Sequence, residues 1–136
     1  EVADVGLGLC PGIIALPRVT SLMQRVLELD ETYYHGGAHI FFGIYYGSRS
    51  PMLGGDYAKS EQHFDQARAI NDNELLVVDM LQAQYLERQR NDQLKFNSLL
   101  TRVVEAPDNL DPDLALMNQI ARRKAKNLLG YQKQWF

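Results

Sequence analysis

The sequence lacks several features that would assign it to a particular class of protein. It has one cysteine, Cys10, in 136 residues, so no disulfide can form within the chain. Its longest apolar stretch, residues 6–17, is too short to span a bilayer and lacks the basic segment of a signal peptide. The formal net charge of −3 provides no basic field for nucleic acid or an anionic membrane.

The remaining composition is typical of one folded domain. Hydrophobic residues make up 46% and charged residues 23%, which is enough apolar material for a core. No segment shows the alternation of a strand, and the apolar spacing predicts about six helices joined by short turns. We expect these helices near residues 18–29, 32–46, 56–70, 74–89, 92–105 and 112–130. Short connections favour antiparallel neighbours, so the predicted fold is all-α.

Turn residues support the predicted helix ends. Asp56 follows a glycine pair and is expected to cap the third helix, while Gly47 is expected to end the second. Asp111 is expected to cap the sixth helix, with Pro112 at the first helical position, where the missing amide hydrogen has no cost.

A repeat spacing occurs twice in the chain. The first copy is His39-x2-Phe42-Gly43-x2-Tyr46, followed by Ser60-x3-Phe64 and Ala67. The second, weaker copy is Val78-x2-Leu81-Gln82-x2-Tyr85, followed by Phe96-x3-Leu100 and Val103. This is tetratricopeptide spacing, in which small residues let two helices approach and bulky residues fill the space around them. We expect stacked antiparallel helical hairpins, a tetratricopeptide-like α-solenoid, over residues 18–136. Residues 1–17 are expected to be an N-terminal extension, either disordered or the remnant of a longer chain.

No catalytic, metal or cofactor site is predicted. His35 and His39 have the spacing of a zinc-binding helix, but Gly36 replaces the glutamate of that motif and a third ligand is missing. The segment 54–60 ends in Lys-Ser without the glycine or the preceding strand of a phosphate loop. Cys10 has no recognisable histidine partner. We therefore expect a protein that is not an enzyme.

A basic run on the last helix has a structural explanation. Arg122, Arg123, Lys124 and Lys126 are expected to form the solvated face of a helix whose other side is apolar. Given the acidic total charge, no nucleic-acid partner is predicted.

Aromatic residues of the second predicted helix are the candidate binding residues. They point in several directions, so one neighbouring helix cannot bury all of them. Those we expect to line a groove, a pore or a subunit interface are Tyr33, Tyr34, Phe41 and Tyr45, with Arg49 just beyond the helix as a contact for an acidic ligand or partner. The alternative is burial of these aromatics under a preceding part of the chain, with Arg49 an ordinary surface residue.

The order of these segments resembles the T-component proteins associated with tripartite ATP-independent periplasmic (TRAP) transporters. The resemblance is carried by residues 25–30, 36–46, Arg49, 53–56, 63–67, 116–121, 124–126, 128–129 and Phe136, and covers roughly residues 18–136. It implies a periplasmic helical-repeat protein, often a lipoprotein, that forms oligomers and assembles with the solute-binding protein of the transporter. It also implies a hydrophobic small ligand as a second partner.

Two expectations follow from this resemblance. Family members are typically longer, so the chain would be the C-terminal portion, with any signal peptide, lipobox and membrane anchor upstream of it. The expected function is a non-catalytic binding and scaffold subunit of a solute uptake system. The alternative that the repeat spacing also allows is a generic tetratricopeptide adaptor that mediates protein–protein interaction.

Overall fold

The structure is a computed structural model that describes residues 11–136, with side chains from residue 16 onward. Cys10 lies outside the described residues. The seven α-helices are α2 (Pro11–Asp30), α3 (Tyr33–Gly47), α4 (Tyr57–Ile70), α5 (Val77–Gln82), α6 (Gln93–Glu105), α7 (Ala115–Gly130) and α8 (Gln132–Trp135). Two 3₁₀ turns, η1 (Pro51–Leu53) and η3 (Pro112–Leu114), and a π-helical turn, η2 (Ala83–Glu87), complete the set. The all-α prediction is confirmed.

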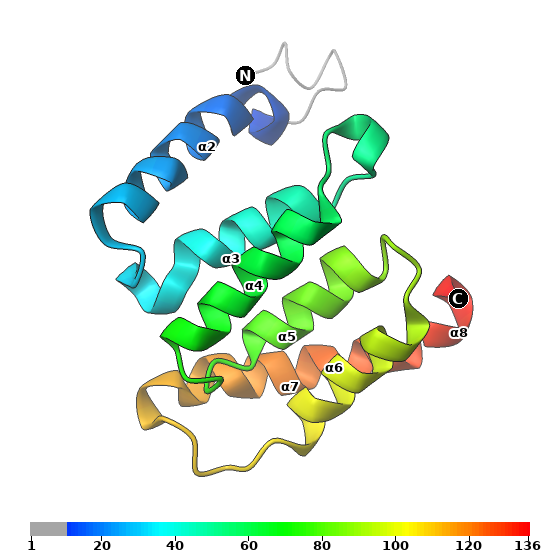
Figure 1. Cartoon of the computed structure of the whole chain (residues 1–136). Coiled ribbons are helices and arrows are strands. Elements are labelled where there is room, and N and C mark those ends of the chain that lie inside the picture. Colours follow the sequence, from blue (N-terminus) through cyan, green and yellow to red (C-terminus); the bar gives the residue numbers. More distant parts are fainter. Residues whose placement is uncertain (1–10) are drawn as a thin grey trace.

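The helices pack in antiparallel pairs (Figure 1). α3 packs against α4, and α5 with η2 packs against α6. α7 follows and contacts both α5 and α6, while α2 lies against α3 at the other end. Because α3, α5 and α7 also contact one another in turn, they form one layer of the molecule.

The predicted helix ends around α4 and α7 are confirmed. The Asp56 carboxylate accepts a hydrogen bond from the backbone N–H of Lys59, as an N-cap residue does. Gly47 is the last residue of α3. The Asp111 carboxylate caps the turn that leads into α7 by accepting from the N–H of Asp113.

Small residues allow the close approach of α3 and α4. A Cβ atom on Gly43 would lie 2.8 Å from the Phe64 ring, and one on Gly47 would lie 2.5 Å from the Ser60 hydroxyl. That hydroxyl donates a 2.6 Å hydrogen bond to the carbonyl of Gly43, while Phe64 is fully buried. The repeat spacing therefore has the packing role that the sequence predicts.

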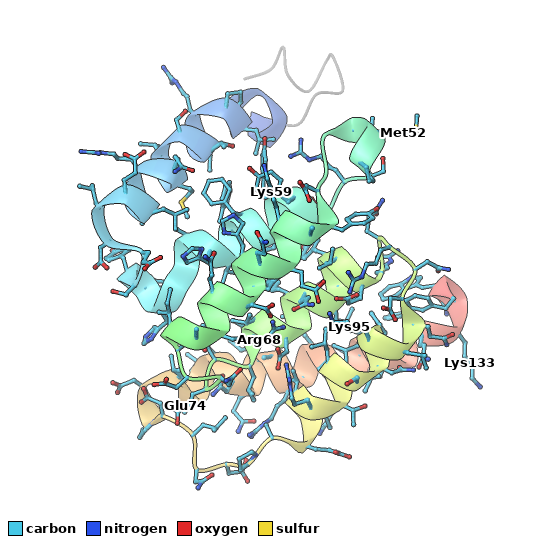
Figure 2. The ribbon with its side chains drawn as sticks, viewed as in Figure 1. Met52, Lys59, Arg68, Glu74, Lys95 and Lys133 are labelled. Atoms are coloured by element: carbon cyan, nitrogen blue, oxygen red, sulfur yellow. The ribbon has the colours of Figure 1, made fainter. Side chains whose placement is uncertain are left out.

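A chain of ion pairs connects α4, α5, η2 and α6. Asp79 accepts from Arg68 at 2.6 Å and from both Nε and Nη2 of Arg102 at 2.7 and 2.6 Å. The fully buried Glu87 accepts from Gln82 at 2.7 Å and from Arg90 at 2.6 Å. Figure 2 marks Arg68 of α4 and Lys95 of α6, which belong to opposite ends of this chain of contacts; Lys95 pairs with Glu61 of α4.

Three details differ from the sequence-based expectation. The helix expected near residue 18 begins at Pro11 and continues across Pro17, although proline lacks an amide donor. The domain division at residue 17 stays a prediction. The helix expected over 74–89 is a short α5 followed by the π turn η2. Finally, the start of α3 is not regular helix, because residues 34–36 have left-handed backbone angles.

Candidate functional site

The layer formed by α3, α5 and α7 contains a cavity of about 400 Å³, which we call the apolar pocket. Its lining residues come from three successive helical segments: Tyr34, His35, Gly37, Ile40, Leu75, Val77, Leu81, Asp113, Leu114 and Met117. Most of these side chains are aliphatic or aromatic, and the polar groups lie near its ends in the sequence. A cavity of this size with mainly apolar walls suits a small hydrophobic ligand or an apolar side chain of a partner.

A left-handed bend shapes one wall of the apolar pocket. Tyr34, His35 and Gly36 have φ angles of 54°, 57° and 82°. This region is unfavourable for tyrosine and histidine by about 1–2 kcal/mol per residue. Gly36 accommodates it, and a Cβ at that position would also lie 3.3 Å from the Cα of Ala67. Strained backbone of this kind is found where the surrounding structure enforces it, and it clusters at binding sites.

The predicted binding residues fall into two groups. Tyr33 and Tyr34 lie together at the start of α3, with ring centroids 6.3 Å apart, and both are exposed. Phe41 and Tyr45 stack at 6.1 Å further along, and the Arg49 guanidinium lies 4.2 Å from the Tyr45 ring centroid. Of the five, only Tyr34 lines the apolar pocket.

Arg49 is fixed by the end of its own helix. Its Nε and Nη2 both donate to the carbonyl of Tyr45, at 3.3 and 3.1 Å, in addition to the cation–π contact with that ring. Phe41 and Tyr45 are only partly buried, so this face of α3 keeps exposed aromatic surface beside a held cation.

Sequence reasoning missed the aliphatic lining of the apolar pocket. Leu81, Leu114 and Met117 come from segments that are far apart in the sequence, and each follows ordinary core spacing. Their convergence depends on how α5 and α7 sit against α3. One signal was available: the pair Gly36–Gly37 directly before a helix indicates a bend, and Gly37 allows the Tyr34 ring to lie close to it, because its Cβ would be 3.5 Å from that ring.

A histidine pair joins α3 and α4 outside the apolar pocket. His39 Nδ1 lies 3.0 Å from His63 Nδ1, and His39 Nε2 lies 3.2 Å from a carboxylate oxygen of Glu31. The His63 ring also stacks on Phe42 and Tyr46. Burial lowers the pKa of His63 below its ordinary value, and His39 and Lys59 lower it further. His35 does not take part, so the pairing of histidines is not the predicted His35–His39 spacing.

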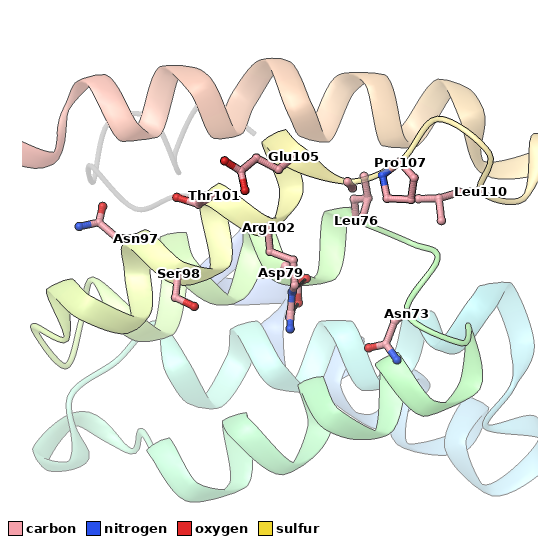
Figure 3. A pocket seen from close by; sticks show the side chains of 11 residues that line it. Asn73, Leu76, Asp79, Asn97, Ser98, Thr101, Arg102, Glu105, Pro107 and Leu110 are labelled. Atoms are coloured by element: carbon pink, nitrogen blue, oxygen red, sulfur yellow. Dashed lines mark hydrogen bonds and ion pairs between the residues drawn. The ribbon is translucent and has the colours of Figure 1, made fainter.

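A second cavity, of about 880 Å³, lies beside α6 (Figure 3). Arg102 and Asp79 meet at its centre, and Asn97, Ser98 and Thr101 follow α6 along it. Because Arg102 and Arg68 both pair with Asp79, the charges here belong to the ion-pair chain that joins the helices. We assign this cavity a structural origin.

The basic run of α7 has a partly different role from the one predicted. Arg122 is largely buried and pairs with Asp108 at 2.6 Å, while its Nη2 donates to the carbonyls of Ala106 and Pro107. It therefore ties the α6–α7 loop to α7 and is not part of a solvated face. Arg123 and Lys124 are exposed as expected.

Two searches of residues 11–136 bear on the class of site. No group of three histidine, cysteine, aspartate or glutamate side chains in this range is arranged to hold a metal ion. Within the same range, no helix combines the length and the apolar character that crossing a membrane requires.

Paired helices, a repeat spacing and an apolar pocket on one layer define a helical-hairpin protein whose surfaces suit binding. The family model described as TRAP transporter T-component matches residues 10–136, nearly the whole chain. The chain belongs to this family. No curated protein matches it at a significant level. Family membership makes it an accessory component associated with TRAP transport.

Proposed function

We propose that this protein is a non-catalytic scaffold subunit that binds the solute-binding protein of a periplasmic TRAP-type uptake system. The apolar pocket and the two tyrosines at its edge are the observation that carries the proposal. Family membership supplies the association with TRAP transport, and the exposed aromatic surface of α3 supplies a contact chemistry that is common at protein interfaces.

The contact surface is the exposed part of α3. Tyr33 and Tyr34 project from its start, and Phe41, Tyr45 and Arg49 form a second patch towards its end. Tyrosine is suited to such a surface because its ring is apolar and its hydroxyl remains hydrated. In the full protein the same helices extend as a tetratricopeptide-like solenoid over residues 18–136, held in the periplasm as an oligomeric lipoprotein.

The apolar pocket is the site for a hydrophobic small ligand. Aliphatic side chains from α5, η3 and α7 form its walls, and Tyr34 stands at its edge with a hydroxyl able to orient a polar end group. A ligand here would contact the same tyrosine as the protein partner, so binding of the two would be coupled through Tyr34.

The test of the partner is isothermal titration of the full-length protein, anchor removed, against the solute-binding protein encoded beside it. We expect saturable binding that Tyr34→Ser weakens at least tenfold. Tyr131→Ser is the matched control, because Tyr131 is an exposed tyrosine on the C-terminal side of α7. Absence of binding, with and without solute, would reject the scaffold function and favour the generic adaptor.

The test of the ligand uses a fluorescent hydrophobic probe, 1-N-phenylnaphthylamine. We expect Met117→Lys to abolish probe binding, because a charge would enter the apolar pocket. Leu116→Lys is the matched control: Leu116 precedes Met117 on α7, is more exposed and does not line the pocket. Equal probe binding by both variants would show that the pocket is not the ligand site.

A further inference from the structure

The end of α2 is attached to the rest of the molecule by few strong contacts. None of residues 16–30 is buried, and large apolar side chains of this helix, including Leu22 and Leu29, remain exposed. A groove of about 380 Å³ separates part of α2 from Phe42 and Tyr46. The left-handed bend at residues 34–36 follows directly, so the chain enters α3 through a segment that is not regular helix.

Glu31, the first residue after α2, makes the polar contact that crosses this junction. Its carboxylate lies 3.2 Å from His39 Nε2, and His39 Nδ1 in turn lies 3.0 Å from His63 Nδ1 on α4. His39 is buried, whereas Glu31 is exposed and His63 is half-buried. A single line of hydrogen bonds therefore runs from the end of α2, through α3, to α4.

The positions of the protons in this line follow from its geometry. A carboxylate only accepts hydrogen bonds, so His39 Nε2 must carry a hydrogen. With His39 neutral, its Nδ1 is then an acceptor, and the hydrogen between the rings belongs to His63 Nδ1. One further proton can enter on the outer nitrogen of His63 without breaking the line. A second cannot, because both facing nitrogens would then be N–H donors, and two cations would stand 3.0 Å apart.

We propose that Glu31, His39 and His63 form a proton-controlled latch that holds the end of α2 against α3 and α4, and that the latch opens when both histidines are protonated. Opening releases α2 from the groove over Phe42 and Tyr46, with residues 34–36 as the hinge. The structure thus assigns α2 a regulatory role that goes beyond partner binding and does not depend on the apolar pocket.

The other charged groups around the latch act in the same direction or are already paired. On α4, Lys59 lies 5.4 Å from the Tyr46 ring and adds positive charge beside His63, which disfavours its protonated form. On α2, the groove is lined by Arg25 and Glu28, which pair with each other at 2.9 Å. Glu31 is therefore the one acidic group among these that is paired with the histidines.

The open and closed states differ in how many protons they bind. With the latch closed, the two histidines hold at most one extra proton, whereas the open state can hold two. Below the ordinary histidine pKa, the ratio of open to closed molecules should therefore rise about tenfold for each pH unit. Near neutral pH the latch should be closed.

The test measures the distance from α2 to α4 by electron paramagnetic resonance. Spin labels are placed at Leu22→Cys and Gln62→Cys, both exposed positions, in the full chain with Cys10→Ser. We expect one distance at pH 7.5, and a second, longer population that grows about tenfold between pH 6 and pH 5. Far-UV circular dichroism at each pH must remain that of the folded protein.

The variants separate the latch from other effects of acid. His63→Gln should stay closed at every pH, because a glutamine amide can donate to or accept from His39 Nδ1 in either protonation state. Glu31→Ala should show the longer distance already at pH 7.5. His35→Gln, which changes the remaining histidine of the chain, should respond to pH like the parent protein.

Three results would overturn the proposal. The first is an unchanged distance in the parent protein down to pH 5. The second is equal opening in His63→Gln, which would place the responsible group elsewhere. The third is release of α2 only together with loss of the helical signal, which would make it part of global unfolding.

Discussion

The two helical hairpins have the same repeat spacing but are held together differently. α3 and α4 approach closely, because Gly43, Gly47 and Ser60 leave room for the Phe64 ring and for a hydrogen bond to the backbone. In the second hairpin, Gln82 occupies the position of Gly43 and Phe96 that of Ser60. The larger volume there is filled by Phe96 and by the ion-pair chain through Asp79 and Glu87. One spacing therefore supports two kinds of helix contact, one limited by volume and one by charge.

The largest expected effect is the loss of a charge from the second hairpin. Asp79→Ala leaves Arg68 and Arg102 without their shared, largely buried partner, and should lower the free energy of unfolding by about 3–5 kcal/mol. The measurement is urea denaturation followed by circular dichroism. Asp65→Ala is the matched control, because this exposed carboxylate also pairs with Arg68 and should cost about 0–1 kcal/mol. Equal losses would mean that the burial of Asp79 does not matter.

The first hairpin should be sensitive to volume. Gly43→Ala places a methyl group 2.8 Å from the Phe64 ring, which must move, and should lower the free energy of unfolding by about 1–3 kcal/mol. Gly130→Ala is the control, since no atom lies within 4 Å of a Cβ there and alanine is the better helix former, by about 0.5–1 kcal/mol. A neutral Gly43→Ala would show that α3 and α4 can separate without cost.

The two hairpins should also respond to acid in different ranges of pH. Folding lowers the pKa of His63, so the unfolded chain takes up that proton first; stability is complete above pH 6.5 and falls as the pH drops from there towards the folded pKa. The measurement is urea denaturation between pH 7.5 and pH 5. His63→Gln should remove this loss, and an unchanged slope in that variant would assign the loss to another group.

The smallest effect is expected from Glu61 of the first hairpin, which reaches across to the second. Lys95, and to a lesser extent Arg90, lower its pKa below the ordinary 4.5. Its contribution is present above pH 4.5 and is lost as the pH falls through the lowered value. Because Glu61 is partly exposed, solvent screens the pairs, and the difference between the parent and Glu61→Gln should be small. Acid denaturation of the two proteins below pH 4.5 measures it.

The sequence is sufficient to predict the features that depend on local chemistry. Asp56 as a cap and Gly43 with Ser60 as a close contact follow from residue type and spacing, and both are confirmed. The predicted aromatic residues stay predictions as binding residues, and only Tyr34 reaches the apolar pocket. The rest of that pocket depends on the relative placement of α3, α5 and α7, which short-range spacing does not contain.

Other features could not be predicted because tertiary contacts override local preference. The left-handed backbone at Tyr34 and His35 is unfavourable for both residue types and exists only because neighbouring segments enforce it. The pair of His39 with His63 joins residues 24 positions apart on different helices. The continuation of α2 across Pro17 likewise runs against the usual effect of proline.

The π turn at Ala83–Glu87 has a consequence for how the repeat is recognised. In an α-helix each residue advances by about 100°, so one extra residue rotates everything that follows by about that angle relative to a regular helix. A motif with a fixed period can therefore match the residues before the turn or those after it, but not both in one phase. The second repeat is fainter in the sequence than in space for this reason: its helix changes phase midway, and the residue brought inward by that change is the charged Glu87.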